Sequence, residues 1–250
     1  VSYSRYGVGH SLLAIPPLAL AHVIEQATGL RTHVALCTLL FVANGALFLA
    51  LVFAYLRGAY SVRRSWAMVC LLGFATIWWP YTKLDFSEPL VLTAVFGAFL
   101  FLRGDRPLSA GLAAGIAVTI RPDALLLVMW LLVWRWWHRR DGRELARVCA
   151  GLAPSLLVWL LANAARSGNL WAAPRYEGQT FATPLLVGLY GILLSAGKSV
   201  FLYSPPLVLG IAGWRRFRRT AAGREDALFF LGAFVLQTLF YACWWDWSGD

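Results

Sequence analysis

The sequence predicts an all-α protein, a polytopic bundle of transmembrane helices with short interfacial helices on its outer face. Composition is the first observation, because 60% of the 250 residues are apolar, 13 are tryptophan and only 14% are charged. Such a chain has too few polar side chains to cover a water-soluble globule of this length. Charge is the second, because the net charge of +10 sorts to one side when the apolar segments are threaded across a bilayer.

The charge also predicts which side is which. With the N-terminal residues outside, the arginine-rich stretches 57–64, 135–147 and 215–224 all lie inside. The inner loops then carry the whole excess of +10, whereas acids and bases balance outside. This is the pattern that the positive-inside rule predicts for a multi-pass protein of the inner or plasma membrane, and it indicates no nucleic-acid partner. The non-cytoplasmic face mixes acids and bases, as an active site does.

The expected elements follow the charge. Residues 12–24 are short and interrupted by Pro16-Pro17, so we expect an interfacial helix there. Residues 34–56 can cross a hydrocarbon core of about 30 Å. Later crossings alternate in direction and are expected at 65–79, 89–102, 148–165, 200–214 and 227–243. Residues 184–194 are apolar but too short to span, which predicts a second interfacial or re-entrant helix.

Residues 108–134 are an exception, because Arg121-Pro122 lies at their centre. A single span would put the arginines at its two ends on opposite sides, so charge favours a hairpin. Its first limb, residues 108–120, reaches only about 20 Å at about 1.5 Å per residue. A limb that short implies a recessed outer surface, with Arg121 and Asp123 at the floor of a wet cavity lined by protein.

The densest polar cluster near the outer membrane edge is Lys83-Leu-Asp85-Phe-Ser-Glu88-Pro89. Asp85 and Glu88 lie three residues apart at the mouth of a helix expected to begin at Pro89, so both carboxylates can face one cavity. The alternative is that Ser87 caps this helix and the acids merely favour its positive end.

Three further charged or titratable residues have competing explanations. Arg121 can fork onto phosphate oxygens, or it can pair with Asp123 alone; we favour a function, because ionisable groups at membrane depth are costly. Lys198 either reaches toward lipid headgroups or makes a second contact to a substrate phosphate. His10 either touches substrate or is simply a polar loop residue.

Other patterns are structural. Gly111-Leu-Ala-Ala-Gly115 is a small-xxx-small motif that predicts close helix packing. The histidines lack metal-ligand spacing and the four cysteines stand singly in apolar runs, so neither a metal site nor a disulfide framework is expected. Residues 1–250 are expected to form part of one membrane domain that is truncated at both ends, because both ends lie in polar loops.

Five motifs occur in one order, each on the expected outer side: Tyr6-Gly-Val-Gly-His-Ser-Leu-Leu-Ala-Ile-Pro16, Trp79-Pro-Tyr81 with Ser87-Glu88-Pro89-Leu, Gly111 to Asp123 ending in Ile-Arg-Pro-Asp, Ser195 to Lys198 followed by Tyr203-Ser-Pro-Pro206, and Trp244-Trp-Asp-Trp-Ser-Gly. Together they resemble the polyprenyl-phosphate-sugar-dependent glycosyltransferases of the GT-C superfamily, which include protein O-mannosyltransferases and the aminoarabinose transferase of lipid A. The resemblance spans nearly the whole chain.

The resemblance implies an enzyme that moves a sugar from a polyprenyl-phosphate carrier to an acceptor glycan, lipid or protein on the non-cytoplasmic side. Membrane lipid and the lipid-phosphate sugar are its implied partners, and it has no separate cofactor. It also implies a main catalytic carboxylate in a first outer loop ahead of Val1. Residues 1–11 contain no acid, so a chain that begins at Val1 is expected to lack full activity.

The chemistry suits the polar residues that remain. Sugar transfer needs a carboxylate to take the acceptor proton and cations to hold the departing phosphate, around a transition state of oxocarbenium character. Asp85 and Glu88 are the candidate catalytic residues. The candidate substrate- and phosphate-binding residues are Lys83, Arg121, Asp123, Lys198, Tyr203, Tyr81 and His10, with aromatic rings suited to stack on sugars or flank the lipid chain.

A membrane transporter or a flippase of lipid-linked sugars is the main alternative, because it also uses short helices and buried charges. A transporter should place its charges near the midplane and often has inverted halves, which the sequence does not show. A noncatalytic scaffold would not need Arg121 and Asp123 at depth.

Overall fold

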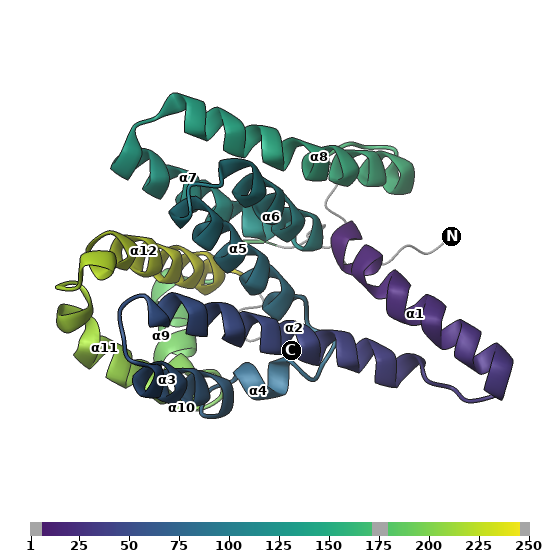
Figure 1. The fold of residues 1–250 in the computed structure, drawn as a ribbon, viewed down its shortest axis with the longest axis horizontal. Coiled ribbons are helices and arrows are strands. Elements are labelled where there is room, and N and C mark those ends of the chain that lie inside the picture. Colours follow the sequence, from purple (N-terminus) through teal and green to yellow (C-terminus); the bar gives the residue numbers. More distant parts are fainter. Residues whose placement is uncertain (1–6, 172–179, 246–250) are drawn as a thin grey trace. The chain divides into compact units, whose positions relative to one another are not determined.

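The computed structural model describes residues 7–171 and 180–245, and these residues contain helices and no strands (Figure 1). The predicted all-α class is therefore confirmed. Tyr6 of the first motif, and Asp246 and the residues after it in the last, lie outside the described residues. Contacts divide the chain into two compact units, and each is described by itself. The single membrane domain stays a prediction.

The first unit comprises Val1–Val52, Pro80–Val128 and Asp141–Arg175. Its helical elements are α1 (Val8–Thr28), most of α2 (His33–Arg57), α5 (Ser87–Arg103), α6 (Pro107–Ile120), the 3-10 turn η1 (Pro122–Ala124), the start of α7 (Leu125–Arg139) and α8 (Gly142–Ser167). The second unit comprises Phe53–Trp79, Met129–Arg140 and Tyr176–Asp250. Its elements are the end of α2, α3 (Val62–Phe74), the start of α4 (Trp78–Tyr81), the rest of α7, α9 (Leu185–Leu194), α10 (Val200–Tyr203), α11 (Pro206–Phe217) and α12 (Ala221–Cys243).

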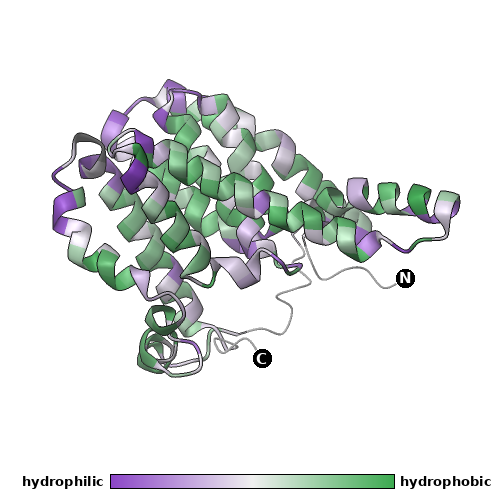
Figure 2. Ribbon diagram, turned by 60° about the horizontal axis from the view of Figure 1, so that its bottom comes forward, coloured by the Kyte–Doolittle hydropathy of each residue, from purple (hydrophilic) through white to green (hydrophobic). Residues whose placement is uncertain are grey.

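In the part of the chain that the structure describes, four helices are long and apolar enough to cross a membrane: α1, α2, α8 and, from Gly223 onward, α12. Between 17% and 22% of the residues in their apolar windows are buried inside the protein. Figure 2 shows apolar residues along most of the helices, with hydrophilic residues gathered at helix ends and turns. Apolar side chains exposed over whole helices fit a lipid surrounding.

Helix α6 is the centre of the first unit, because it lies between α5 and α8 and packs closely against both (Figure 1). A Cβ atom at Gly111 would collide with the carbonyl oxygen of Val148, and one at Gly151 would collide with the carbonyl oxygen of Leu108. The backbones of α6 and α8 therefore meet directly, with no side chain between them. This confirms the helix packing predicted from the small residues Gly111 and Gly115.

The helix at the N-terminus is longer than the sequence indicates. α1 continues unbroken through Pro16-Pro17, and it is long and apolar enough to span a membrane. The prediction of a short helix interrupted by the prolines is wrong, because apolar helices can satisfy the carbonyls that a proline frees through local adjustments and neighbouring groups. The sorting of charge is the observation that still favours an interfacial position.

Two expected crossing segments are interrupted. Residues 65–79 hold most of α3 and the start of a separate α4. The two are divided because the Thr76 hydroxyl donates to the Leu72 carbonyl and accepts from the Trp78 amide in place of the helical ladder. Residues 200–214 divide between α10 and α11. The break falls at Ser204, which precedes Pro205 and has an extended φ of −140°.

The other expected segments form helices near their predicted bounds. Residues 34–56, 89–102, 148–165, 184–194 and 227–243 lie in α2, α5, α8, α9 and α12 respectively, with α9 beginning one residue later than expected.

Candidate functional site

The candidate site begins where α6 ends. Arg121 has φ −143° and ψ 121°, and Pro122 opens the short turn η1. A residue before proline avoids the α conformation, which ends the helix at Ile120. One continuous helix over residues 108–134 is therefore excluded. Most of α7 belongs to the second unit, so the complete hairpin stays a prediction.

Arg121 is buried, with a side-chain exposed fraction of 7%. Its Nε and Nη2 atoms donate to the two carboxylate oxygens of Asp123 at 3.0 and 3.1 Å. Its Nη1 atom contacts a carboxylate oxygen of Glu88 and donates to Ser87 Oγ at 3.5 Å. All three guanidinium nitrogens therefore have acceptors, as a cation removed from water requires.

The two carboxylates on Arg121 have different surroundings. The Asp123 side chain is 5% exposed, whereas that of Glu88 is 45% exposed. Breaking the Arg121–Asp123 pair would leave uncompensated charge on side chains that are 7% and 5% exposed, whereas Glu88 can exchange Arg121 for water at lower cost. The Arg121–Asp123 pair of the alternative interpretation exists, and the structure adds Glu88 to it.

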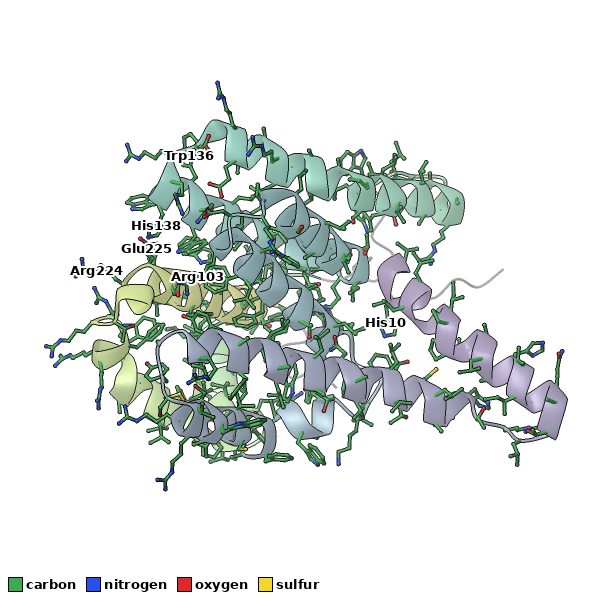
Figure 3. All side chains as sticks on the ribbon, in the orientation of Figure 1. His10, Arg103, Trp136, His138, Arg224 and Glu225 are labelled. Atoms are coloured by element: carbon green, nitrogen blue, oxygen red, sulfur yellow. The ribbon has the colours of Figure 1, made fainter. Side chains whose placement is uncertain are left out.

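Asp85 contacts a different partner. Its Oδ1 atom lies 2.8 Å from His10 Nε2, and its own side chain is 68% exposed. His10 lies in the first turn of α1 (Figure 3), where its ring is buried and stacks on Phe41 with a centroid distance of 5.8 Å. Loop polarity therefore does not explain His10. No spacing in the sequence could have revealed the pair, because 75 positions separate the two residues.

The start of α1 reaches the end of α6 through small residues. A Cβ atom at Gly7 would collide with the carbonyl oxygen of Ile120, and one at Gly9 would collide with the side chain of Thr119. Both contacted residues directly precede Arg121. Arg121, Glu88 and Asp123 together form the Arg121 cluster. The His10–Asp85 pair and the Arg121 cluster thus lie around the same end of α6.

The start of α5 differs from the prediction. The helix begins at Ser87 and not at Pro89, its N-cap is Phe86, and no side-chain capping bond is formed. The alternative in which Ser87 caps the helix is wrong, because the Ser87 hydroxyl lies within the helix and faces Glu88 and Arg121 at 3.5 Å. Asp85 lies in the preceding turn, so the carboxylates of Asp85 and Glu88 do not share a helix face.

Two more candidates lie beside this helix start. Tyr81 stacks on Phe86 with ring centroids 4.6 Å apart. Burial raises the pKa of Tyr81 above its usual value of 10, and the negative charge of Glu88 raises it further. Tyr81 is therefore coupled electrostatically to the Arg121 cluster. Lys83 follows α4 and is exposed.

Lys198 and Tyr203 belong to the second unit. Lys198 is exposed, and its backbone amide donates to Ser195 Oγ at 3.2 Å. The Tyr203 ring is 49% exposed, and its hydroxyl donates to the Ala196 carbonyl at 3.5 Å. These bonds order the turn around α10. A joint role of either residue with Arg121 stays a prediction.

Among residues 7–171 and 180–245, no group of three or more His, Cys, Asp or Glu side chains is arranged to hold a metal ion.

The class of the protein follows from its helices: four apolar helices of membrane-spanning length make the chain a multi-pass membrane protein. Comparisons with protein-family models, curated proteins and solved structures find no match. Any finer assignment therefore depends on the motifs in the sequence and on the geometry around Arg121.

Proposed function

We propose that this protein is an integral-membrane glycosyltransferase that moves a sugar from a polyprenyl phosphate to an acceptor on the non-cytoplasmic side. One observation carries the proposal. Arg121, Glu88 and Asp123 gather with the Asp85–His10 pair around one end of α6. A permanent cation beside carboxylates that reach solvent suits a reaction that releases a phosphate and removes a hydroxyl proton.

The proposed reaction exchanges one bond of the sugar for another. The acceptor oxygen bonds to the anomeric carbon while the bond from that carbon to the phosphate oxygen breaks. The polyprenyl phosphate leaves with the electron pair, and Arg121 stabilises the charge that develops on it. The acceptor hydroxyl proton passes to Asp85 or Glu88.

Each residue of the cluster has a distinct part in this proposal. Asp123 holds the guanidinium plane through its two hydrogen bonds, while phosphate replaces the half-exposed Glu88 on Nη1 of Arg121. Glu88 is then free to accept a proton or to bind sugar hydroxyls. His10 positions the Asp85 carboxylate, whose Oδ1 atom lies 2.8 Å from His10 Nε2. Lys83 adds positive charge, and Tyr81 offers a ring to the sugar.

The test measures transfer of labelled sugar from polyprenyl-phosphate donors in proteoliposomes that contain the natural full-length protein. Arg121→Ala should lower kcat by a factor of about 10²–10³, because it removes a charge-assisted contact made in the transition state. Arg121→Lys should recover only part of the lost activity, because an ammonium ion cannot donate two parallel hydrogen bonds to the phosphate as a guanidinium does. Glu88→Gln and Asp85→Asn should reduce turnover in a folded protein.

Glu25→Gln is the matched control, because the Glu25 side chain is 44% exposed and pairs with Arg31 away from the cluster. It should retain wild-type turnover. Normal turnover in Arg121→Ala and in both carboxylate variants would contradict the proposed roles. If no polyprenyl-phosphate sugar serves as donor, the protein is better explained as a transporter or flippase, to be tested by movement of lipid-linked sugar across the vesicle membrane.

A further inference from the structure

A second site lies at the other end of α6. A cavity of about 350 Å³ is lined by Arg106, Pro107, Leu108, Ser109 and Arg147. The sequence indicates these two arginines only as part of the basic inner loops, because 41 positions separate them. The cavity is independent of the cluster proposed for sugar transfer.

A compact turn places the first arginine. The amide of Asp105 donates to the Leu102 carbonyl at 3.2 Å and that of Arg106 to the Phe101 carbonyl at 2.9 Å, while Asp105 has a left-handed φ of 53°. These bonds end α5 in the manner of a Schellman motif. Pro107 begins α6 at the next residue, so Arg106 is the N-cap of that helix.

Helix packing places the second arginine. The Val148 carbonyl meets the backbone of α6 at Gly111, where a Cβ atom would not fit. This contact fixes the register of α8 against α6. Arg147 directly precedes Val148, so the same contact holds Arg147 beside the first turn of α6.

The electrostatics of the cavity favour an anion. Arg106 and Arg147 are exposed, and within residues 7–171 and 180–245 neither side chain has a hydrogen bond or an ion pair. Both charges lie at the N-terminus of α6, where the helix dipole and the free amides of the first turn already favour negative charge. Two cations at that end repel each other and the dipole. Bound phosphate would relieve both repulsions, with Ser109 as a further donor.

The apolar surroundings indicate where the phosphate comes from. Leu108, Leu112 and Ile116 follow one another at four-residue spacing along α6, and they are 56%, 48% and 40% exposed. This row, the α6 stripe, starts at the cavity. Arg147 lies in the second turn of α8, a helix long and apolar enough to span a membrane, and a basic residue near the end of such a span can meet lipid phosphates.

We propose that the cavity binds the phosphate of an anionic phospholipid, with an acyl chain of that lipid lying along the α6 stripe. Arg106 and Arg147 hold the phosphate from two helices, and Leu108 continues the site toward the hydrocarbon. On the sidedness predicted by charge, this lipid belongs to the cytoplasmic leaflet.

The test is lipid binding to the purified protein, measured by native mass spectrometry during titration with phosphatidylglycerol or phosphatidylcholine. Phosphatidylglycerol should bind more tightly than the zwitterionic lipid. Arg106→Gln and Arg147→Gln should each lower the affinity for phosphatidylglycerol about tenfold, which corresponds to the loss of one charge-assisted hydrogen bond. Leu112→Ser should also weaken the binding of phosphatidylglycerol, because it interrupts the α6 stripe.

Arg143→Gln is the matched control, because Arg143 lies one turn before Arg147 on α8 and does not line the cavity. It should bind the lipid as the wild type does. Equal affinity of all arginine variants, or equal loss in Arg143→Gln, would overturn the proposal. Competition by excess inorganic phosphate, with Leu112→Ser unchanged, would identify a free-anion site and would also overturn the assignment to a lipid. Circular dichroism of each variant verifies that it is folded.

Discussion

The two ends of α6 carry the same residue type in opposite settings. At the C-terminal end, Arg121 is buried between Asp123 and Glu88. At the N-terminal end, Arg106 is exposed beside a second arginine, and no carboxylate pairs with it among residues 7–171 and 180–245. The helix dipole favours a cation at the C-terminal end of α6 and an anion at its N-terminal end.

The comparison shows how the surroundings of an arginine determine what it can bind. Buried Arg121 needs its carboxylates, so in the proposed reaction phosphate replaces one of them, and the half-exposed Glu88 is the one that can leave. Arg106 and Arg147 need no exchange, because their donors are open to a ligand. The C-terminal end of α6 therefore suits a transient contact during the proposed reaction, and the N-terminal end suits the proposed resident lipid.

The largest effect should come from Asp123→Ala. It removes the buried carboxylate that accepts two hydrogen bonds from Arg121 and should lower the free energy of unfolding by about 3 kcal/mol, measured by denaturation in mixed micelles. The double variant Arg121→Met with Asp123→Leu should be less destabilised, because it removes both charges. Arg106→Ala should change stability by no more than about 0.5 kcal/mol. Equal losses in Asp123→Ala and Arg106→Ala would remove the distinction between the two ends.

A smaller loss is expected from Gly151→Ala. The new methyl group collides with the Leu108 carbonyl and pushes α8 from the start of α6, which should cost about 1–3 kcal/mol and weaken lipid binding through Arg147. Gly97→Ala in α5 is the control, because nothing lies within 4 Å of its Cβ position. It should stabilise the protein by about 0.5–1 kcal/mol. A neutral Gly151→Ala would show that the helix crossing does not set the cavity.

The smallest effect concerns the ionisation of Tyr81, which lies near the Arg121 cluster. Burial and the charge of Glu88 raise the pKa of Tyr81, so the folded protein favours the neutral phenol. The stability that this contributes is complete below pH 10, the usual pKa, and declines as pH rises through the folded pKa. Glu88→Gln should lower the pKa of Tyr81 but leave it above 10, because burial is the larger cause. NMR titration of labelled tyrosine, assigned with Tyr81→Phe, measures this.

Arg106→Gln is the control for the titration, because its charge lies at the opposite end of α6. It should leave the Tyr81 titration unchanged. An equal shift in Glu88→Gln and Arg106→Gln would mean that Tyr81 responds to the net charge of the protein and not to the neighbouring carboxylate.

Local patterns predicted much of the architecture. Apolar run length identified α2, α8 and α12 as potential spans, small residues predicted the packing of α6, and Arg121-Pro122 predicted where α6 stops. These features depend on neighbouring residues, so the sequence contains them. The prolines of α1 misled the prediction, because proline weakens a helix without always ending it.

By itself, the sequence determined the all-helical membrane class and the position of a costly arginine at the end of α6, because hydrophobicity, charge and proline act along the chain. Only the tertiary structure decided which groups meet: Glu88 with Arg121, Asp85 with His10, and Arg147 with Arg106 across one cavity. These partners lie far apart in sequence, and backbone contacts at glycines such as Gly9 and Gly111 bring them together. Such contacts depend on the three-dimensional fit of whole helices, and no short pattern of residues encodes that fit.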